Sequence, residues 1–361
     1  MKIKSVYIEN YRSLKDFEID FTNDNGQINP VTILTGINGC GKTTLLNAIY
    51  ELYNNNCSEP DNLKSFVEID ISDNTENKKS SKKIFKLTSE YFDNKHSKSN
   101  PLILPNIIYY KPNQDNPDAK QIILDFVENL INDKYVNSSD AHDFLRNLLN
   151  DLLGGLDLQI EFSRIERNKD VYFRNSINDR IKFKELSDGE KELITKTFPI
   201  FLANLRDTVI LIDEPESSLH PNWQNEVIRL YRVLAQEQNL QFIISTHSPH
   251  IVSAVENKYI KILTKKNDEI VVTNTSALSY GKKVSKILID IFHVKGLRTP
   301  KVEKKLSELK LLFIRRKYNS PEFHALLKEL EETIGKIDTD LVRIRTEVQK
   351  AKMLREDKKI D

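Results

Sequence analysis

Residues 36–43 have the types and spacing of a loop that binds phosphate groups. They read Gly-Ile-Asn-Gly-Cys-Gly-Lys-Thr and match the pattern G-x-x-x-x-G-K-[ST] in full. The glycines allow successive backbone N–H groups to turn inward onto phosphate oxygens, Lys42 supplies a positive charge to the outer phosphates, and the Thr43 hydroxyl is a ligand for Mg²⁺. The alternative is a chance glycine-rich turn. An apolar run before the loop and a helical pattern after it favour the phosphate-binding interpretation.

Two acidic residues follow an apolar run in the second half of the chain. Val209–Ile212 is apolar, and Asp213 and Glu214 come directly after it. Strands often end in acidic residues, so this pattern gains its meaning from the glycine loop. A carboxylate at the end of a buried strand lies where Mg²⁺ is held, and the next carboxylate can polarise an attacking water. We therefore expect Asp213 to hold the metal, directly or through water, and Glu214 to act as general base.

A short polar segment, Ser187-Asp188-Gly189-Glu190, precedes a helical pattern. The spacing of Ser187 and Glu190 is that of a capping box, in which the two side chains satisfy free backbone N–H groups of the first helical turn. A capped helix N-terminus is also a site for anions. The structural and functional interpretations are compatible, and the position ahead of the Asp213 strand favours a role in the same site.

Two histidines lie after the apolar runs. His247 follows Phe242–Ser245, and a lone histidine after a strand is more often structural. Beside a phosphate-binding loop, however, an imidazole is placed to sense and position a terminal phosphate, so we interpret His247 as a catalytic residue. His220 lies in the tight connection Ser217–Pro221, a candidate contact to a partner subunit, and we interpret its side chain as structural.

The periodicity of apolar residues predicts the elements that must position these segments. Short apolar or alternating runs predict strands at residues 3–8, 17–21, 31–34, 66–71, 84–87, 107–110, 158–162, 171–173, 181–183, 209–212 and 242–245. Helical spacing predicts helices over residues 43–53 and 120–153, after residue 187, and from 282 onward. The fully apolar runs at 209–212 and 242–245 fit parallel strands covered on both faces. The runs at 66–71 and 84–87 are interpreted as edge strands of an N-terminal sheet.

Composition excludes several classes of protein. The 361 residues carry 54 Lys and Arg against 53 Asp and Glu, which excludes a histone-like polycation and an acidic solvating tail. Two cysteines are too few for a disulfide framework. The N-terminus has no signal-peptide pattern, and no apolar run approaches the roughly 20 residues that span a bilayer. We expect a cytoplasmic protein with no membrane partner.

Together these segments resemble the ABC-type ATPase heads of the SMC, RecF and OLD group, in the expected order over residues 1–275. Residues 8–14 resemble the opening strand and turn of that group, 186–191 its signature, 213–221 its Asp-Glu box and following D-loop, and 245–249 its switch-histidine segment. The signature departs from that of transporters at Asp188, where they have glycine, and at Glu190. These departures, the Arg12 opening and the appended tail disfavour a transporter subunit.

The resemblance implies an α/β fold with a mixed or antiparallel N-terminal sheet and a parallel core sheet flanked by helices. It implies ATP and Mg²⁺ as cofactors, with ATP held between two heads arranged head to tail. The implied nucleotide-binding residues are Arg12, Ser13, Asn38, Gly39, Cys40, Gly41, Lys42, Thr43 and Thr44. The implied catalytic residues are Lys42, Glu214 and His247, and the metal ligands are Thr43, Asp213 and Gln114, the last as candidate for a glutamine that follows an intermediate strand. Ser187, Asp188, Gly189 and Glu190 would complete the site of the other chain.

The tail resembles a narrower group. Residues 287–292, 298–306 and 340–345 are similar to the C-terminal helices of PtuA-type ATPases, which belong to Septu-like anti-phage systems and some retrons and work beside a separately encoded HNH nuclease. A simple helical cap on the head is the alternative. We expect a head over residues 1–280, with a helical insertion at about 115–155, and a helical module over 281–361.

Two functions remain open at this level. The leading hypothesis is an ATPase subunit of an anti-phage complex that regulates a partner nuclease through the tail, with DNA or RNA as a further candidate partner. Neither a long coiled coil nor a nuclease-like acidic cluster is evident, so the chain itself is not expected to cut nucleic acid. The alternative is a RecF-like, ATP-dependent protein of DNA repair or recombination, which would bind DNA without a nuclease partner.

Overall fold

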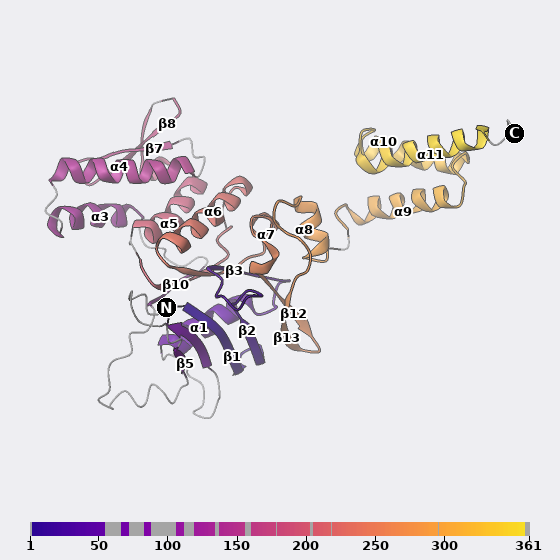
Figure 1. Cartoon of the computed structure of the whole chain (residues 1–361). Helices are drawn as coiled ribbons and strands as arrows, with labels where there is room; N and C mark the ends of the chain where they lie inside the picture. Colours follow the sequence, from indigo (N-terminus) through magenta and orange to yellow (C-terminus); the bar gives the residue numbers. More distant parts are fainter. Residues whose placement is uncertain are drawn as a thin grey trace. The chain divides into compact units, whose positions relative to one another are not determined.

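A computed structural model gives the fold of the chain (Figure 1). It describes residues 2–54, 66–71, 83–87, 106–111, 119–133, 137–155, 160–177, 179–202, 205–217, 219–294 and 296–357. The chain forms two compact units, residues 1–292 and 293–361. Two apolar clusters lie in the first unit and a separate one lies in the second.

A six-stranded sheet with the order β13-β12-β3-β11-β10-β6 is the centre of the larger unit. Its strands are β3 (Val31–Thr35), β6 (Asn106–Tyr110), β10 (Thr208–Asp213), β11 (Gln241–Ser245), β12 (Ile260–Lys266) and β13 (Glu269–Asn274). All neighbours run parallel except β13, which is antiparallel to β12. Every residue of β3, β10 and β11 is buried, which confirms the prediction that β10 and β11 are parallel strands with both faces covered.

The two faces of this core sheet pack against different partners. Alternate residues of one strand serve both: Ile210 belongs to the cluster that includes α5 (Asp188–Leu202), α6 (Pro221–Glu237) and α7 (Pro249–Ser253), whereas Leu211 belongs to the cluster around α1 (Lys42–Asn54). In Figure 1, α5, α6 and α7 lie on one side of β3 and β10, and α1 lies on the other side. The period of two along a strand thus builds a three-layer arrangement.

The N-terminal sheet lies on the α1 side of the core. Its strands are β1 (Lys2–Tyr11), β2 (Leu14–Asp20), β4 (Phe66–Ile71) and β5 (Lys83–Leu87), all antiparallel in the order β2-β1-β4-β5. The prediction that residues 66–71 form an edge strand is wrong, because β4 pairs with β1 on one side and β5 on the other. The Gln241 side chain accepts from Ile3 N at 2.7 Å and donates to Ile3 O at 2.8 Å, which ties β1 to the core sheet.

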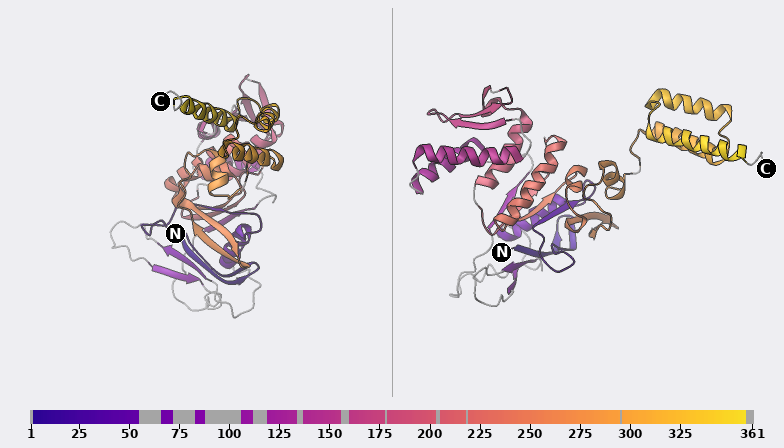
Figure 2. Two further views of the ribbon diagram at one scale, coloured as in Figure 1. Left: turned by 90° about the vertical axis from the view of Figure 1, so that its right-hand side faces the viewer. Right: turned by 45° about the horizontal axis from the view of Figure 1, so that its top comes forward.

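A subdomain of helices and a small sheet lies between β6 and β10 in the sequence. The predicted helical stretch is two helices, α3 (Ala119–Asp133) and α4 (Ser138–Gly155). They are followed by the antiparallel sheet β7 (Ile160–Ile165), β8 (Val171–Asn175) and β9 (Arg180–Lys182). The apolar residues of β7 and β8 join the cluster that includes α4, and both views of Figure 2 show the hairpin beside that helix.

The second unit is a helical module with its own apolar core. It contains α9 (Pro300–Ile314), α10 (Pro321–Ile334) and α11 (Thr339–Asp357). Arg298 donates to both Asp338 and Asp340, which fixes the start of α11 to the segment before α9. The helix α8 (Val284–Asp290), which the sequence analysis assigns to the tail, packs on α7 in the first unit. Among the described residues, no helix has the length and apolar character needed to cross a bilayer.

Candidate active site

The glycine loop closes around its own lysine. Lys42 begins α1, is only 5% exposed, and donates from Nζ to Gly36 O at 3.0 Å and to Ile37 O at 3.3 Å. Its ammonium also lies 3.8 Å from the buried sulfur of Cys40. Burial lowers the pKa of Lys42 from its usual value. The Lys42 N–H groups that would donate to phosphate oxygens thus donate to these two backbone carbonyls instead.

Two glycines of the loop are required by packing. Gly36 and Gly41 have φ of 146° and 86°, a region that other residues rarely adopt. A Cβ at Gly41 would lie 2.7 Å from Ile270 Cδ1, and one at Gly36 would collide with Leu263 O. Gly39, in contrast, has φ of 77° with nothing within 4 Å of a Cβ, so that part of the loop borders open space.

The turn between β1 and β2 borders this loop. Arg12 has φ of 53°, and its guanidinium lies 5.1 Å from the centre of the Tyr11 ring and 3.8 Å from a carboxylate oxygen of Glu51 on α1. The Ser13 hydroxyl lies 3.7 Å from where a Cβ of Gly41 would be. The structure thus places Ser13 beside the glycine loop and Arg12 beside the second half of α1.

Three strands of the core sheet end level with one another at this loop. Asp213 of β10 is opposite Ser245 of β11, which is opposite Leu34 of β3. Since the strands are parallel, the glycine loop after β3, Glu214 after β10 and His247 after β11 all leave the same edge.

Asp213 has a free oxygen at this edge. Its side chain is 3% exposed, and Oδ1 accepts from the Ser245 hydroxyl. Oδ2 is buried and makes no hydrogen bond of normal geometry among the described residues, and the same holds for the Tyr109 hydroxyl on the adjacent strand β6. The two groups nevertheless interact, because burial and then the charge of Asp213 raise the pKa of Tyr109. A buried carboxylate oxygen without a donor is costly unless a cation or water meets it. Asp213 and the exposed hydroxyl-bearing Thr43 are oxygen donors of the kind that Mg²⁺ prefers, so the residues fit that ion.

Glu214 and His247 face each other. Glu214 has φ of 50°, held by its N–H donating to Ser245 O at 3.0 Å, and its Oε1 lies 3.8 Å from His247 Nε2. Burial, followed by the charge of Lys42, lowers the pKa of His247 below its usual value. The imidazole is therefore neutral at pH 7. Lys42, Glu214 and His247, predicted separately from three segments, are brought to one place.

Glu216 is a site residue to which the sequence analysis gives no role. Its Oε1 accepts from Thr246 Oγ1 at 2.7 Å, from His247 N at 2.7 Å and from Ser248 N at 3.1 Å. Burial raises the pKa of Glu216, and its other oxygen is buried without a partner among the described residues. Glu216 thus ties the loop after β10 to the loop that carries His247. The only signal in the sequence is that Glu216 is the second glutamate of Asp-Glu-Pro-Glu.

The signature segment forms the predicted capping box at the start of α5. Ser187 N and Oγ donate to Glu190 Oε2 at 2.8 and 2.6 Å, and Glu190 N donates to Ser187 Oγ at 3.3 Å. Ser187 and Asp188 are exposed, and Gly189 is half-buried. No hydrogen bond or ion pair between described residues joins this turn to the glycine loop of the same chain. Gln114, the other predicted metal ligand, lies outside the described residues.

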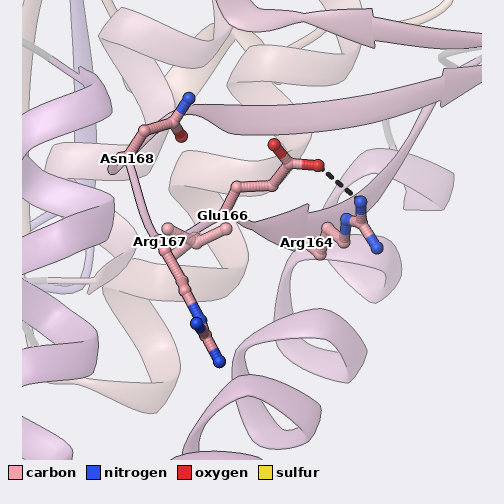
Figure 3. A pocket seen from close by; sticks show the side chains of 5 residues that line it. Arg164, Glu166, Arg167 and Asn168 are labelled. Carbon is pink, nitrogen blue, oxygen red and sulfur yellow. Dashed lines mark hydrogen bonds and ion pairs between the residues drawn. The ribbon is translucent and has the colours of Figure 1, made fainter.

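A separate hollow of about 520 Å³ lies at the turn between β7 and β8 (Figure 3). It is lined by Arg164, Ile165, Glu166, Arg167 and Asn168. Arg164 pairs with Glu166, and the Arg167 side chain points away from that pair. None of the predicted site residues lines this hollow, so it is no part of the site built on Lys42.

The larger unit has the α/β fold of SMC head domains, with the glycine loop between β3 and α1. The SMC head bound to the C-winged helix domain of ScpA has the same fold, with a TM-score of 0.50 and 15% identity, over 76% of this chain and 98% of that one. A family model described as "AAA ATPase domain" matches residues 1–152, and another AAA domain model matches residues 84–253.

Several proteins with similar sequences belong to retron and Septu systems. The chain is 27% identical to the retron Ec83 probable ATPase of Escherichia coli, over 80% of this chain and 53% of that protein. It is 24% identical to Septu protein PtuA of Bacillus mycoides, over 83% of this chain and 44% of that protein. PtuA of Bacillus thuringiensis is 30% identical over 42% of each. The chain thus spans about half the length of the first two relatives, and it resembles the retron and PtuA ATPases over most of its own length.

Proposed function

We propose that the chain hydrolyses ATP with Mg²⁺ at the edge where β3, β10 and β11 end. The observation that carries this proposal is the convergence of Lys42, Asp213, Glu214 and His247 from three segments. Mg²⁺, when bound with ATP, would offset charge on the phosphate groups.

Each residue has a distinct task in this proposal. Lys42 exchanges its carbonyl partners for phosphate oxygens, and Thr43 and Asp213 offer oxygens to the metal. Glu214 accepts the proton of the attacking water. The neutral His247, 3.8 Å from Glu214, donates a hydrogen bond to the terminal phosphate and thereby reports its presence.

We further propose that two copies complete each site. In the signature turn Ser187 and Asp188 are exposed and Gly189 and Glu190 are half-buried, and among the described residues no hydrogen bond or ion pair joins the turn to the glycine loop of its own chain. A capped helix N-terminus offers backbone N–H groups and a positive dipole end, which suit phosphate oxygens. In a head-to-tail dimer this turn reaches the nucleotide of the partner.

The biological role we propose is regulation of a separately encoded HNH-type nuclease in anti-phage defence, with DNA or RNA as a further candidate partner. The support is the similarity to retron and Septu ATPases over most of this chain. The helical module is the proposed contact to the nuclease: Leu311 and Ile314, one turn apart on α9, are 50% and 71% exposed. This similarity favours defence over a RecF-like repair role.

Purification of the native complex tests this proposal. A tagged chain, expressed with its neighbouring genes and isolated with ADP or with a non-hydrolysable ATP analogue, should bring down a nuclease and should hydrolyse ATP only with Mg²⁺. Recovery of no nuclease under either condition would count against the defence role. Hydrolysis that survives removal of Mg²⁺ would contradict the proposed chemistry independently of the partner.

A further inference from the structure

Lys196 links the signature helix to the loop that follows Glu214. It lies on α5, its side chain is 12% exposed, and Nζ donates to Pro215 O at 3.1 Å and to Ser217 O at 2.8 Å. Lys196 Nζ also forms an ion pair with Oε1 of Glu192, one turn earlier on α5, at 2.9 Å. The ammonium therefore exchanges most of its water for two backbone carbonyls of one loop and a carboxylate of its own helix.

The two carbonyls flank Glu216, which extends the link. Glu216 holds the Thr246–Ser248 segment through three hydrogen bonds to one oxygen. The residue before Pro215 is Glu214, whose backbone is confined at φ of 50°. A displacement of the Pro215–Ser217 loop would therefore reach both Glu214 and His247.

The other end of α5 is the signature turn. Ser187 and Lys196 are nine residues apart, so about 13 Å of helix separates them. The internal proline of α5, Pro199, lies beyond Lys196, so the first turns of the helix, between Ser187 and Lys196, can pass a displacement of the signature turn along their backbone hydrogen bonds. Lys196 thus lies where a movement of the signature turn would be passed to the hydrolytic residues of the same chain.

We propose that Lys196 is a positioning residue that couples the signature turn, which acts on the partner's nucleotide, to Glu214 and His247 of its own site. The inference rests on the proposed two-chain ATPase. When the turn at Ser187 docks on a phosphate, α5 is fixed, and Lys196 then fixes the Pro215–Ser217 loop. The two sites of a dimer are thereby committed to hydrolysis together.

The first test is Lys196→Met in the full chain, which keeps the length of the side chain and removes its charge and donors. Affinity for a fluorescent ATP analogue should stay within about twofold, because Lys42 and its loop are untouched, whereas kcat should fall at least about tenfold. Thr197→Val is the matched control, since the Thr197 hydroxyl lies in the same turn of α5 and, among the described residues, donates to Leu193 O of its own helix at 2.8 Å and to no atom of the Pro215–Ser217 loop. Its kcat should stay near that of the wild type. Lys196→Arg, which keeps donors and charge, should restore part of the turnover.

The second test is a double-mutant cycle with Ser187→Ala. Two sites this far apart with no shared partner normally have independent effects. The coupling predicts that the double variant turns over about as slowly as the slower single variant. If instead the fold loss of kcat in the double variant equals the product of the losses in the two single variants, the proposal is overturned. An unchanged kcat in Lys196→Met or in Ser187→Ala would overturn it too. Failure of the ATPase proposal is distinguishable, because the unmodified chain would then hydrolyse no ATP at all.

Discussion

The Lys42 ammonium is already bound by its own loop before any nucleotide arrives. Its partners are the carbonyls of Gly36 and Ile37, and burial lowers its pKa. Removing the side chain deletes a charged donor to phosphate and leaves the two carbonyls without one. Lys42→Ala should weaken ATP binding by about tenfold to a hundredfold, the range for charged hydrogen bonds. Titration with a fluorescent ATP analogue measures this affinity, with Lys301→Ala, a change at an exposed lysine of the second unit, as control. An affinity of Lys42→Ala equal to that of the wild type would contradict the role of Lys42.

Glu214 is separable from the metal site. Asp213 holds the oxygen suited to Mg²⁺, whereas Glu214 lies beside His247. Glu214→Gln keeps the shape and removes the basic oxygen, so we expect ATP binding to persist and kcat to fall about 10²–10⁴-fold. The variant should accumulate as an ATP-bound dimer in size-exclusion chromatography. Hydrolysis at the unmodified rate would mean that another group is the base.

His247 gives a dependence of stability on pH with a defined sign. Its pKa is lowered in the folded chain, so the unfolded chain binds the proton more readily. The stability associated with neutral His247 is fully present above its ordinary pKa of about 6.5 and is lost as pH falls through the lowered folded value. Thermal unfolding without nucleotide should therefore lose less Tm between pH 7.5 and 5.5 in His247→Asn than in the wild type. Identical losses would contradict the shift.

The signature turn is both a helix cap and the proposed contact to the partner's nucleotide. Ser187→Arg should block closure of the dimer by bulk while leaving each glycine loop able to bind ATP. It should also cost about 1 kcal/mol of stability through loss of the cap. Ser320→Arg in the second unit is the matched control, because Ser320 caps α10 by accepting from Phe323 N at 3.2 Å. Dimerisation of Glu214→Gln should be lost with Ser187→Arg and kept with Ser320→Arg.

The elements that carry the site are largely predictable from sequence, and the links between them are not. Apolar runs predict β10 and β11 as buried parallel strands, because a covered strand has no polar face. The interior position of β4 has no signal in its own sequence, because its two neighbours, β1 and β5, come from an earlier and a later segment of the chain. Lys196 also gives no local signal, because a lysine on a helix ordinarily faces water. Its acceptors follow it by about twenty residues and are backbone atoms.

The whole chain consists of two units with separate apolar cores. Within the described part of the second unit, the apolar core consists of residues of α9 to α11 and the segments between them. A chain that ends after Phe292 should therefore keep the ATP affinity and the main unfolding transition of the first unit. If the module contacts the nuclease as proposed, the shortened chain should no longer bring it down. Loss of nucleotide binding on shortening would mean that the units are not independent.

The course of the chain through the core sheet has a consequence for how such proteins can diverge. β6 and β10 are adjacent, with Asn106 opposite Thr208, yet α3, α4, β7 to β9 and α5 all lie between them in the sequence. Because this segment leaves and re-enters the sheet at neighbouring strands, the part of it that precedes α5, namely α3, α4 and β7 to β9, can lengthen, shrink or be replaced without disturbing the register of Asp213 with Ser245. New binding surfaces can therefore evolve between β6 and α5 while the ends of β3, β10 and β11 keep their positions.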